Sequence, residues 1–165
     1  MKTLSLPDQR SLEAAEGWLG LGDHVSAQAE LRQISPEMQS HPEVLLVEWQ
    51  INAHSKQWEV CVEIAAALVE MLPALENGWI ERSFALHELK RTQEAFDLLL
   101  PAEKKFPENW TIPYNLACYC AQLARLSEAK RWLKRAMAID ADTVKREAKD
   151  DPDLKPLRDS LRGAP

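Results

Sequence analysis

The residues that decide the fold are 76–109, with the sequence ENGWIERSFALHELKRTQEAFDLLLPAEKKFPEN. They contain two segments with apolar residues at helical spacing, separated by a polar break at Lys90-Arg91-Thr92. Pro107 follows the second segment, and proline disfavours helix in the residue before it. This pattern predicts two helices joined by a short turn.

The same pattern recurs along the chain with a period of 34 residues. Small or apolar residues repeat at this spacing in three series: Ala27, Cys61, Ala95 and Ala129; Leu31, Ala65, Leu99 and Leu133; and Ile34, Leu68, Ala102 and Ala136. A fixed period in this range is typical of repeat proteins, in which each unit buries its apolar face against its neighbours. The sequence therefore predicts an array of helix pairs.

The third helix pair resembles the tetratricopeptide repeat (TPR) of bacterial proteins. The residues that match are Trp79, Ser83 and Leu86 on the first helix, and Ala95, Leu99, Ala102 and Pro107 on and after the second. The resemblance implies an all-α, right-handed α-solenoid of four helix-turn-helix units at about residues 7–37, 41–73, 76–107 and 110–141. We expect a C-terminal capping helix within residues 142–165, and a single TPR domain spanning residues 1–165.

Local signals mark the first turn and the cap. Gly22 lies at the first break between helices, where a left-handed residue commonly ends a helix. Near the other end, Asp151-Pro152-Asp153 predicts a turn before a last short helix. A terminal repeat needs a covering element, because its outer apolar face would otherwise meet water. We expect Leu154, Leu157 and Leu161 to face the core from this cap.

The composition and net charge of the chain indicate which classes of partner it disfavours. The chain has 165 residues, 45% of them hydrophobic, with a net charge of −6 and a pI near 5.3, which argues against nucleic acid as the main partner. The charge is uneven, with a net −7 over residues 1–75 and +1 over residues 76–165. This asymmetry could favour head-to-tail packing of copies in weak salt, and a solvated surface is the simpler interpretation.

We expect the protein to lie in the cytoplasm without contacting a membrane. The start, MKTLSLPDQR, has no long apolar core or small-residue cleavage site, so no signal peptide is predicted. No stretch approaches the ~18 apolar residues of a membrane span. Three cysteines without a CxxC pair are typical of a reducing compartment.

The candidate binding residues form a second stripe on the first helices. At helical spacing, Ile80, Phe84 and His87 lie on one face, rotated from the face that must pack on the second helix. In TPR proteins the matching positions face a concave groove. Carried across, the groove residues are Leu46, Gln50 and His54; Ile80, Phe84 and His87; and Tyr114, Asn115 and Cys118. The alternative is that this stripe packs against neighbouring helices as core.

The resemblance implies a non-catalytic protein–protein interaction module or adaptor that binds an apolar or helical peptide in this groove. The alternative is structural self-assembly, as a homo-dimer or scaffold component, with the C-terminal helix of the same or a neighbouring copy as the bound element. No catalytic triad spacing or glycine-rich phosphate loop occurs, so we expect no enzyme activity and no cofactor. We also expect no metal, because no ligand spacing within a helix supports one.

Overall fold

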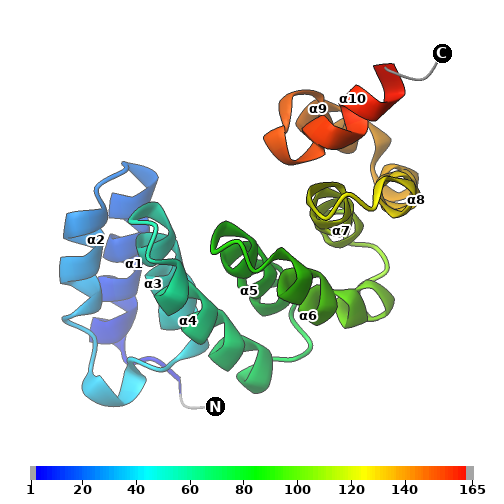
Figure 1. The fold of residues 1–165 in the computed structure, drawn as a ribbon. Coiled ribbons are helices and arrows are strands. Elements are labelled where there is room, and N and C mark those ends of the chain that lie inside the picture. The colour runs from blue at the N-terminus through cyan, green and yellow to red at the C-terminus, as the bar shows by residue number, and fades with distance from the viewer. Residues whose placement is uncertain (1–2, 163–165) are drawn as a thin grey trace. The chain divides into compact units, whose positions relative to one another are not determined.

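The computed structural model describes residues 3–162, and side chains for residues 3–160. All regular structure in this range is helical (Figure 1), which confirms the prediction of four helix pairs and a C-terminal cap. The chain divides into two compact units, Met1–Gly78 (unit 1) and Trp79–Pro165 (unit 2), each described by itself below. The right-handed course of the array and the single domain stay predictions.

Unit 1 contains the first two helix pairs. They are α1 (Leu6–Gly20) with α2 (His24–Leu31), and α3 (Pro42–His54) with α4 (Trp58–Met71), with a 3₁₀ turn (Pro36–Met38) between the pairs. The apolar residues at helical spacing meet in one cluster: Leu4, Leu12, Ala15, Ala27, Leu31, Ile34, Val44, Val47 and Ile51. Leu45, Ile64 and Leu68 form a smaller cluster between α3 and α4. Burial of these side chains is the main stabilising contribution to the unit.

A buried carboxylate joins the start of α1 to the end of the first pair. Asp8 Oδ1 accepts hydrogen bonds from the backbone N–H of Ser35 (2.8 Å) and its hydroxyl (2.9 Å), while Oδ2 accepts from the Ser5 hydroxyl (2.6 Å). These bonds, from Ser35 first and then Ser5, lower the pKa of Asp8 from 3.8 to about 2. Asp8 is therefore charged at neutral pH, and it holds the two ends of the first pair together.

Unit 2 contains the other two pairs and the cap. Most of α5 (Glu76–Glu88) belongs to it, followed by α6 (Thr92–Lys105), α7 (Thr111–Gln122), α8 (Leu126–Ile139), α9 (Ala141–Asp150), a 3₁₀ turn (Pro152–Leu154) and α10 (Lys155–Arg162). Its buried core includes Leu86, Leu99, Leu116, Ala129 and Ala136. The cap contacts α7 and α8. Leu154 and Leu157 are buried, as predicted, whereas the side chain of Leu161 lies outside the described residues.

The repeat period is visible in the backbone itself. The turn inside each helix pair has one residue of positive φ, and these residues are 34 positions apart: Gly22 (78°), Lys56 (54°), Lys90 (64°) and Ala124 (60°). The following residues, Asp23, Gln57, Arg91 and Arg125, each donate a backbone hydrogen bond to the carbonyl five residues earlier. This is the Schellman arrangement, which satisfies carbonyls at a helix end. The left-handed conformation predicted for Gly22 is confirmed.

Candidate functional site: the face of α5 and α7

The nine predicted groove residues belong to two units. Leu46, Gln50 and His54 lie on α3 in unit 1. The other six lie on α5 and α7 in unit 2: Ile80, Phe84, His87, Tyr114, Asn115 and Cys118. That all nine share one groove stays a prediction.

The three residues on α3 differ in exposure. Leu46 is partly buried and packs against Leu45, Ile64 and Leu68, so part of its side chain belongs to the core. Gln50 and His54 are exposed. The ring of His54 lies against that of His24 from α2, with 3.1 Å between ring centroids. Gln50 and His54 are therefore accessible in unit 1.

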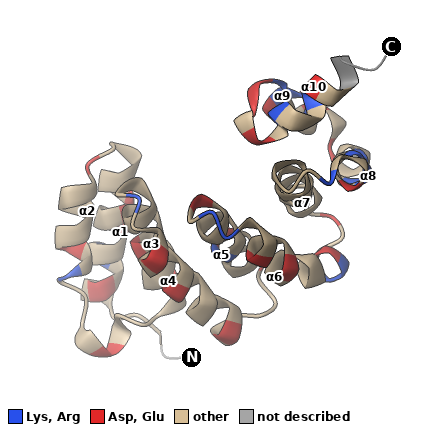
Figure 2. Ribbon diagram, viewed as in Figure 1, with Lys and Arg blue, Asp and Glu red and all other residues tan. Residues whose placement is uncertain are grey.

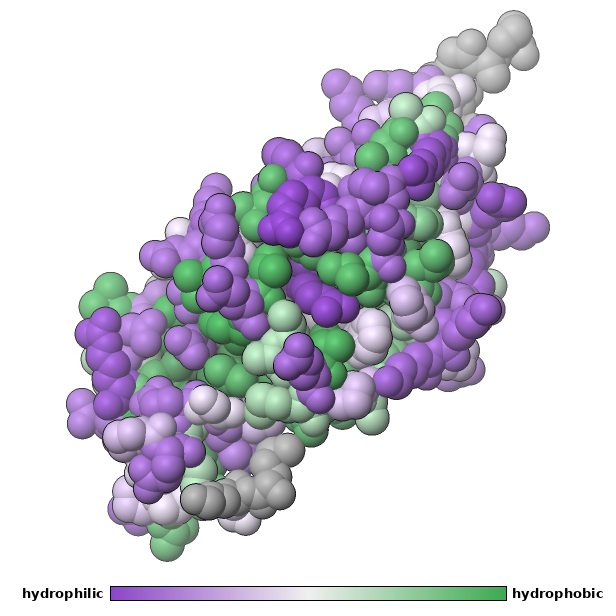
Figure 3. Space-filling view, turned by 60° about the horizontal axis from the view of Figure 1, so that its bottom comes forward, coloured by the Kyte–Doolittle hydropathy of each residue, from purple (hydrophilic) through white to green (hydrophobic). Residues whose placement is uncertain are grey.

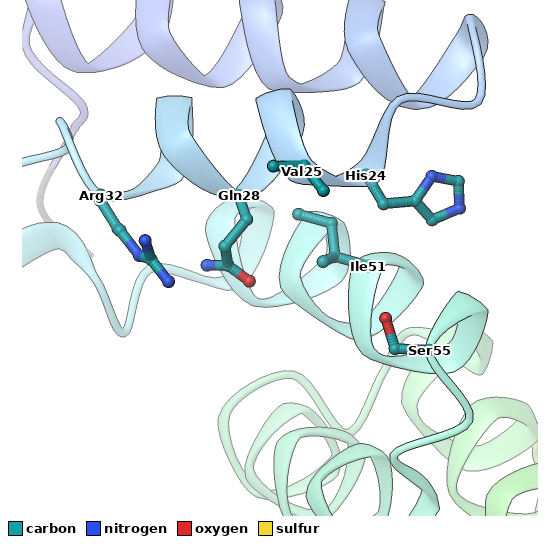
Figure 4. Close-up of a pocket in the computed structure, with 6 residues that line it drawn as sticks. All are labelled: His24, Val25, Gln28, Arg32, Ile51 and Ser55. Carbon is teal, nitrogen blue, oxygen red and sulfur yellow. The ribbon is translucent and has the colours of Figure 1, made fainter.

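A shallow hollow of about 240 Å³ lies between α2 and α3 beside this histidine pair. Figure 4 shows its lining, with Val25 and Gln28 from α2 and Arg32 just after it, above Ile51 from α3 and Ser55 just after it. No group of three or more His, Cys, Asp or Glu side chains within the described residues is placed to hold a metal ion. We therefore assign no ligand to this hollow.

In unit 2, the chain's own C-terminal region covers part of the predicted site. We call residues 151–154 the acidic turn. His87 at the end of α5 is buried; its Nδ1 lies 2.9 Å from Thr92 Oγ1 and its Nε2 lies 3.1 Å from Asp153 Oδ2. The hydrogen bond with His87 lowers the pKa of Asp153, so the carboxylate form is favoured. His87 thus connects α5 to the acidic turn.

Two predicted residues on α7 hold the other carboxylate of the acidic turn. The Tyr114 hydroxyl donates to Asp151 Oδ2 at 2.5 Å, and Cys118 Sγ donates to the same oxygen at 3.6 Å. Burial, together with the neighbouring Asp151, raises the pKa of Tyr114 and the pKa of Cys118 well above their usual values. Cys118 is therefore a protonated hydrogen-bond donor rather than a thiolate nucleophile.

One further donor completes this arrangement. Gln122, one turn beyond Cys118 on α7, donates from Nε2 to the backbone carbonyl of Asp153 at 2.8 Å. Four side chains thus hold the acidic turn, and we call them the α5–α7 face: His87, Tyr114, Cys118 and Gln122. Leu154 follows the two aspartates and is only 1% exposed, so an apolar side chain anchors the same segment.

The remaining predicted residues of unit 2 stay nearer the surface. Ile80 and Asn115 are partly buried, and Phe84 is 40% exposed. Figure 3 shows one face of the molecule, on which hydrophobic residues lie among hydrophilic ones. Phe84 is therefore exposed at the surface, whereas His87, Tyr114 and Cys118 are buried and hydrogen-bonded to the acidic turn.

Asp151 and Asp153 are the residues of this candidate site that sequence reasoning missed. The Asp-Pro-Asp-Leu run was predicted as a turn with a capping aspartate, and Asp151 Oδ1 does accept from the Asp153 backbone N–H, but partners on other helices were not predicted. A signal existed, since the predicted groove residues His87 and Tyr114 can both donate hydrogen bonds, and donors suit an acidic segment.

Glu81 on α5 is a second carboxyl group of interest. No hydrogen-bond partner among the described residues reaches its Oε2, although that atom is buried. Burial raises the pKa of Glu81 from 4.5 to about 7. The carboxyl group is therefore close to half-protonated at neutral pH.

Comparison with known proteins places the fold. No family profile and no curated protein matches the sequence. Among solved structures, a thermophilic TPR protein of Thermus thermophilus superposes with a TM-score of 0.70 at 20% identity, covering 96% of this chain and 92% of that one. MamA 41-end from Desulfovibrio magneticus RS-1 gives 0.74 at 12% identity, with 97% and 96% covered. Another MamA structure gives 0.75 at 13% identity, with 94% and 86% covered.

These identities show the fold alone. The chain has the fold of TPR proteins, as the repeat pattern predicted. No helix within residues 3–162 is long and apolar enough to cross a membrane. What the protein binds has to be argued from its own surface.

Proposed function

We propose that this protein is a non-catalytic interaction module that holds a segment of a partner protein on its α5–α7 face. One observation carries the proposal, namely that this face already holds a peptide segment, the chain's own acidic turn. The contacts are side-chain hydrogen bonds to two carboxylates and one backbone carbonyl. Side chains that hold an internal segment in this way can hold an external segment of the same chemistry.

The bound segment indicates the chemistry of the partner. His87 and Tyr114 each pair with one carboxylate, and these two carboxylates are two residues apart. Leu154 follows them and is buried. A matching partner segment has two acidic residues separated by one residue, followed by a leucine, in a helical turn. Such a segment has the apolar side chain and the helical conformation expected from the sequence, and in addition it must have two acidic residues.

The acidic turn regulates access to the face. A partner segment must displace residues 151–154 before it contacts Tyr114 or Cys118, both of which are buried. The apparent association constant is then the intrinsic constant multiplied by the fraction of molecules in which the turn is displaced. A partner held only by this face therefore binds more weakly to the intact protein than to one whose turn is released.

The other predicted residues extend the proposed site. Phe84 and Asn115 lie on the same two helices as the α5–α7 face, and Ile80 lies one turn before Phe84. Leu46, Gln50 and His54 on α3 are proposed contacts of unit 1 by itself. The proposed location is the cytoplasm, which an odd number of cysteines without a CxxC pair supports.

A peptide selection tests this function. The bait is the full chain with Asp151→Ala and Asp153→Ala, which releases the acidic turn. We expect it to enrich peptides with an acidic-x-acidic-leucine pattern, and wild type to retain them more weakly. The control bait carries Tyr114→Phe and Gln122→Ala in addition, and it should lose these peptides. Enrichment that is unaffected by this control would contradict the proposal.

A further inference from the structure

Unit 2 has a hollow of its own, which is separate from the α5–α7 face. It lies between α6 and α8 and has a volume of about 480 Å³. Its apolar lining comes from Phe96 and Leu100 on α6 and from Trp132 on α8. Leu100 is 39% exposed, so the apolar surface is open to a ligand. A hollow of this size accommodates one or two large apolar side chains.

Contacts between α6 and α8 hold this hollow in shape. Arg135 donates from Nε to Glu103 Oε1 at 3.1 Å at one end. Near the other end, Arg125 donates to Gln93 Oε1, and its guanidinium lies 5.7 Å from the ring centroid of Phe96. These contacts join α6 to α8 and to the residue before it, beside the hollow.

The side chains that line the hollow include two acidic residues, Glu103 and Glu128, and two basic residues, Arg131 and Arg135, so the excess of positive charge comes from the rest of α8. Helix α8 has four basic residues, Lys130, Arg131, Lys134 and Arg135, and one acidic residue, Glu128. Within the described residues, only Arg135 of these four forms an ion pair. Lys130 and Lys134 lie on α8 outside the lining, and Arg131 lines the hollow together with Glu128. An occupant with acidic groups beside an apolar side chain fits this surface.

Unit 1 of the same protein presents that combination. The sequence of unit 1 has 4 basic and 12 acidic side chains, whereas that of unit 2 has 16 and 14. Figure 2 shows acidic residues on the helices of unit 1 with few basic ones. At the corner where α1 joins α2, Leu21 is 78% exposed and Val25 is 83% exposed. Asp23 lies between them, and hydrogen bonds from Ser26 lower its pKa, so it is charged at neutral pH. The corner thus has two exposed apolar side chains beside an acidic one.

We propose that the α6–α8 hollow binds the α1–α2 corner of a second copy of this chain. Leu21 and Val25 enter the hollow against Leu100 and Trp132, while the acidic surface of unit 1 faces the cations of α8. The two surfaces differ, so the contact is head-to-tail and each copy keeps one free corner and one free hollow. This assembly does not involve the α5–α7 face and does not depend on the proposed function.

Sedimentation velocity of the full chain tests the contact. We expect association that increases with protein concentration at about 0.01 M ionic strength and weakens at about 1 M, because the Debye length falls from about 30 Å to about 3 Å. Wild type that stays monomeric over the whole concentration range at low ionic strength would overturn the proposal.

Two variants identify the surfaces. The corner variant carries Leu21→Ser and Val25→Ser, and the hollow variant carries Leu100→Ser and Arg131→Glu. All four side chains are exposed, so both variants should fold, which their melting curves verify. Each should raise the dissociation constant of self-association at least about tenfold. Leu6→Ser, a 72% exposed residue at the other end of α1, is the matched control and should associate like wild type.

Mixing the two variants gives the decisive result. The hollow variant keeps its corner and the corner variant keeps its hollow, so an equimolar mixture should form heterodimers and stop there. A mixture that stays monomeric, or a control variant that loses association equally, would overturn head-to-tail docking. Association that persists in either variant alone would mean that copies meet through another surface, and would also overturn it.

Discussion

His87 and Asp153 are 66 residues apart in sequence, and their side chains lie 3.1 Å apart between Nε2 and Oδ2. The first lies in the last turn of α5, and the second belongs to the acidic turn before α10. Together with Tyr114 and Asp151, this pair makes the C-terminal cap the occupant of the α5–α7 face. The cap therefore both covers the end of the array and blocks the proposed binding site.

Asp153→Asn should weaken this closure. The carboxylate is partly exposed, so we expect a loss of about 1 kcal/mol in the free energy of unfolding at pH 7. Hydrogen bonding by His87 lowers the pKa of Asp153 below 3.8 in the folded state, so its stabilisation is present above that value and is lost as the pH falls through the folded pKa. Urea unfolding of wild type and variant should therefore differ at pH 7 and converge in acid.

A matched variant controls for this substitution. Asp159→Asn, on α10, removes the same charge from an exposed residue. Its stability should equal that of wild type at both pH values. An equal loss from both variants would show that the net charge of the cap, rather than the bond with His87, causes the effect.

Substitutions at two of the left-handed turn residues should change the free energy of unfolding in opposite directions. Gly22→Ala should destabilise by about 1 kcal/mol, because a side chain at φ 78° is strained. Ala124→Gly should stabilise by about 0.5–1 kcal/mol, since it removes the same strain at φ 60°. Gly17→Ala, inside α1 and with no atom within 4 Å of the added Cβ, should stabilise by about 1 kcal/mol. Thermal unfolding measures all three, and a stabilising Gly22→Ala would contradict the assigned turn.

Asp8 should make unit 1 sensitive to acid. Its pKa is lowered from 3.8 to about 2, so its contribution is complete above about pH 4 and is lost between about pH 4 and pH 2. Asp8→Asn should lower the melting temperature at pH 7, and the difference from wild type should shrink across that window. Glu13→Gln, an exposed change on the same helix, is the control and should leave the melting temperature unchanged.

Glu81 should have the opposite pH dependence. Because burial raises its pKa from 4.5 to about 7, the charged form destabilises the fold progressively between these values and fully above about pH 7. Glu81→Gln should therefore stabilise the protein by about 1–3 kcal/mol at pH 8 and by almost nothing near pH 4.5. Equal stabilities of variant and wild type at pH 8 would indicate that Glu81 is solvated.

Much of the fold could be predicted from the sequence because the repeat signal is local and recurs. The spacing of Ala27, Cys61, Ala95 and Ala129 identifies the close contacts between helices, and all four residues are buried. The left-handed conformation was predicted only at Gly22, since lysine and alanine give no such signal at the equivalent turns. At these turns the packing of the repeated helix pairs overrides the preference of lysine and alanine for negative φ.

The site was less predictable for a different reason. A helical stripe indicates which residues share a face, and the stripe with His87 was found in this way. What covers the face depends on contacts between residues that are distant in sequence, such as Tyr114 with Asp151. The repeat period does not relate these two positions, so a single sequence gives no sign of the contact. Whether Ile80 and Phe84 bind a partner stays a prediction for the same reason.

The most direct test of the central claim is a peptide titration followed by fluorescence polarisation. The peptide is a labelled KDDPDLKPLRD, the sequence of residues 149–159, and a second peptide with alanine for its second and third aspartates is the control. We predict that the Asp151→Ala/Asp153→Ala protein binds the first peptide at least about tenfold more tightly than wild type and ignores the second. Equal affinity of both proteins for both peptides, or no binding at all, would contradict the claim that the α5–α7 face is a peptide-binding surface closed by the acidic turn.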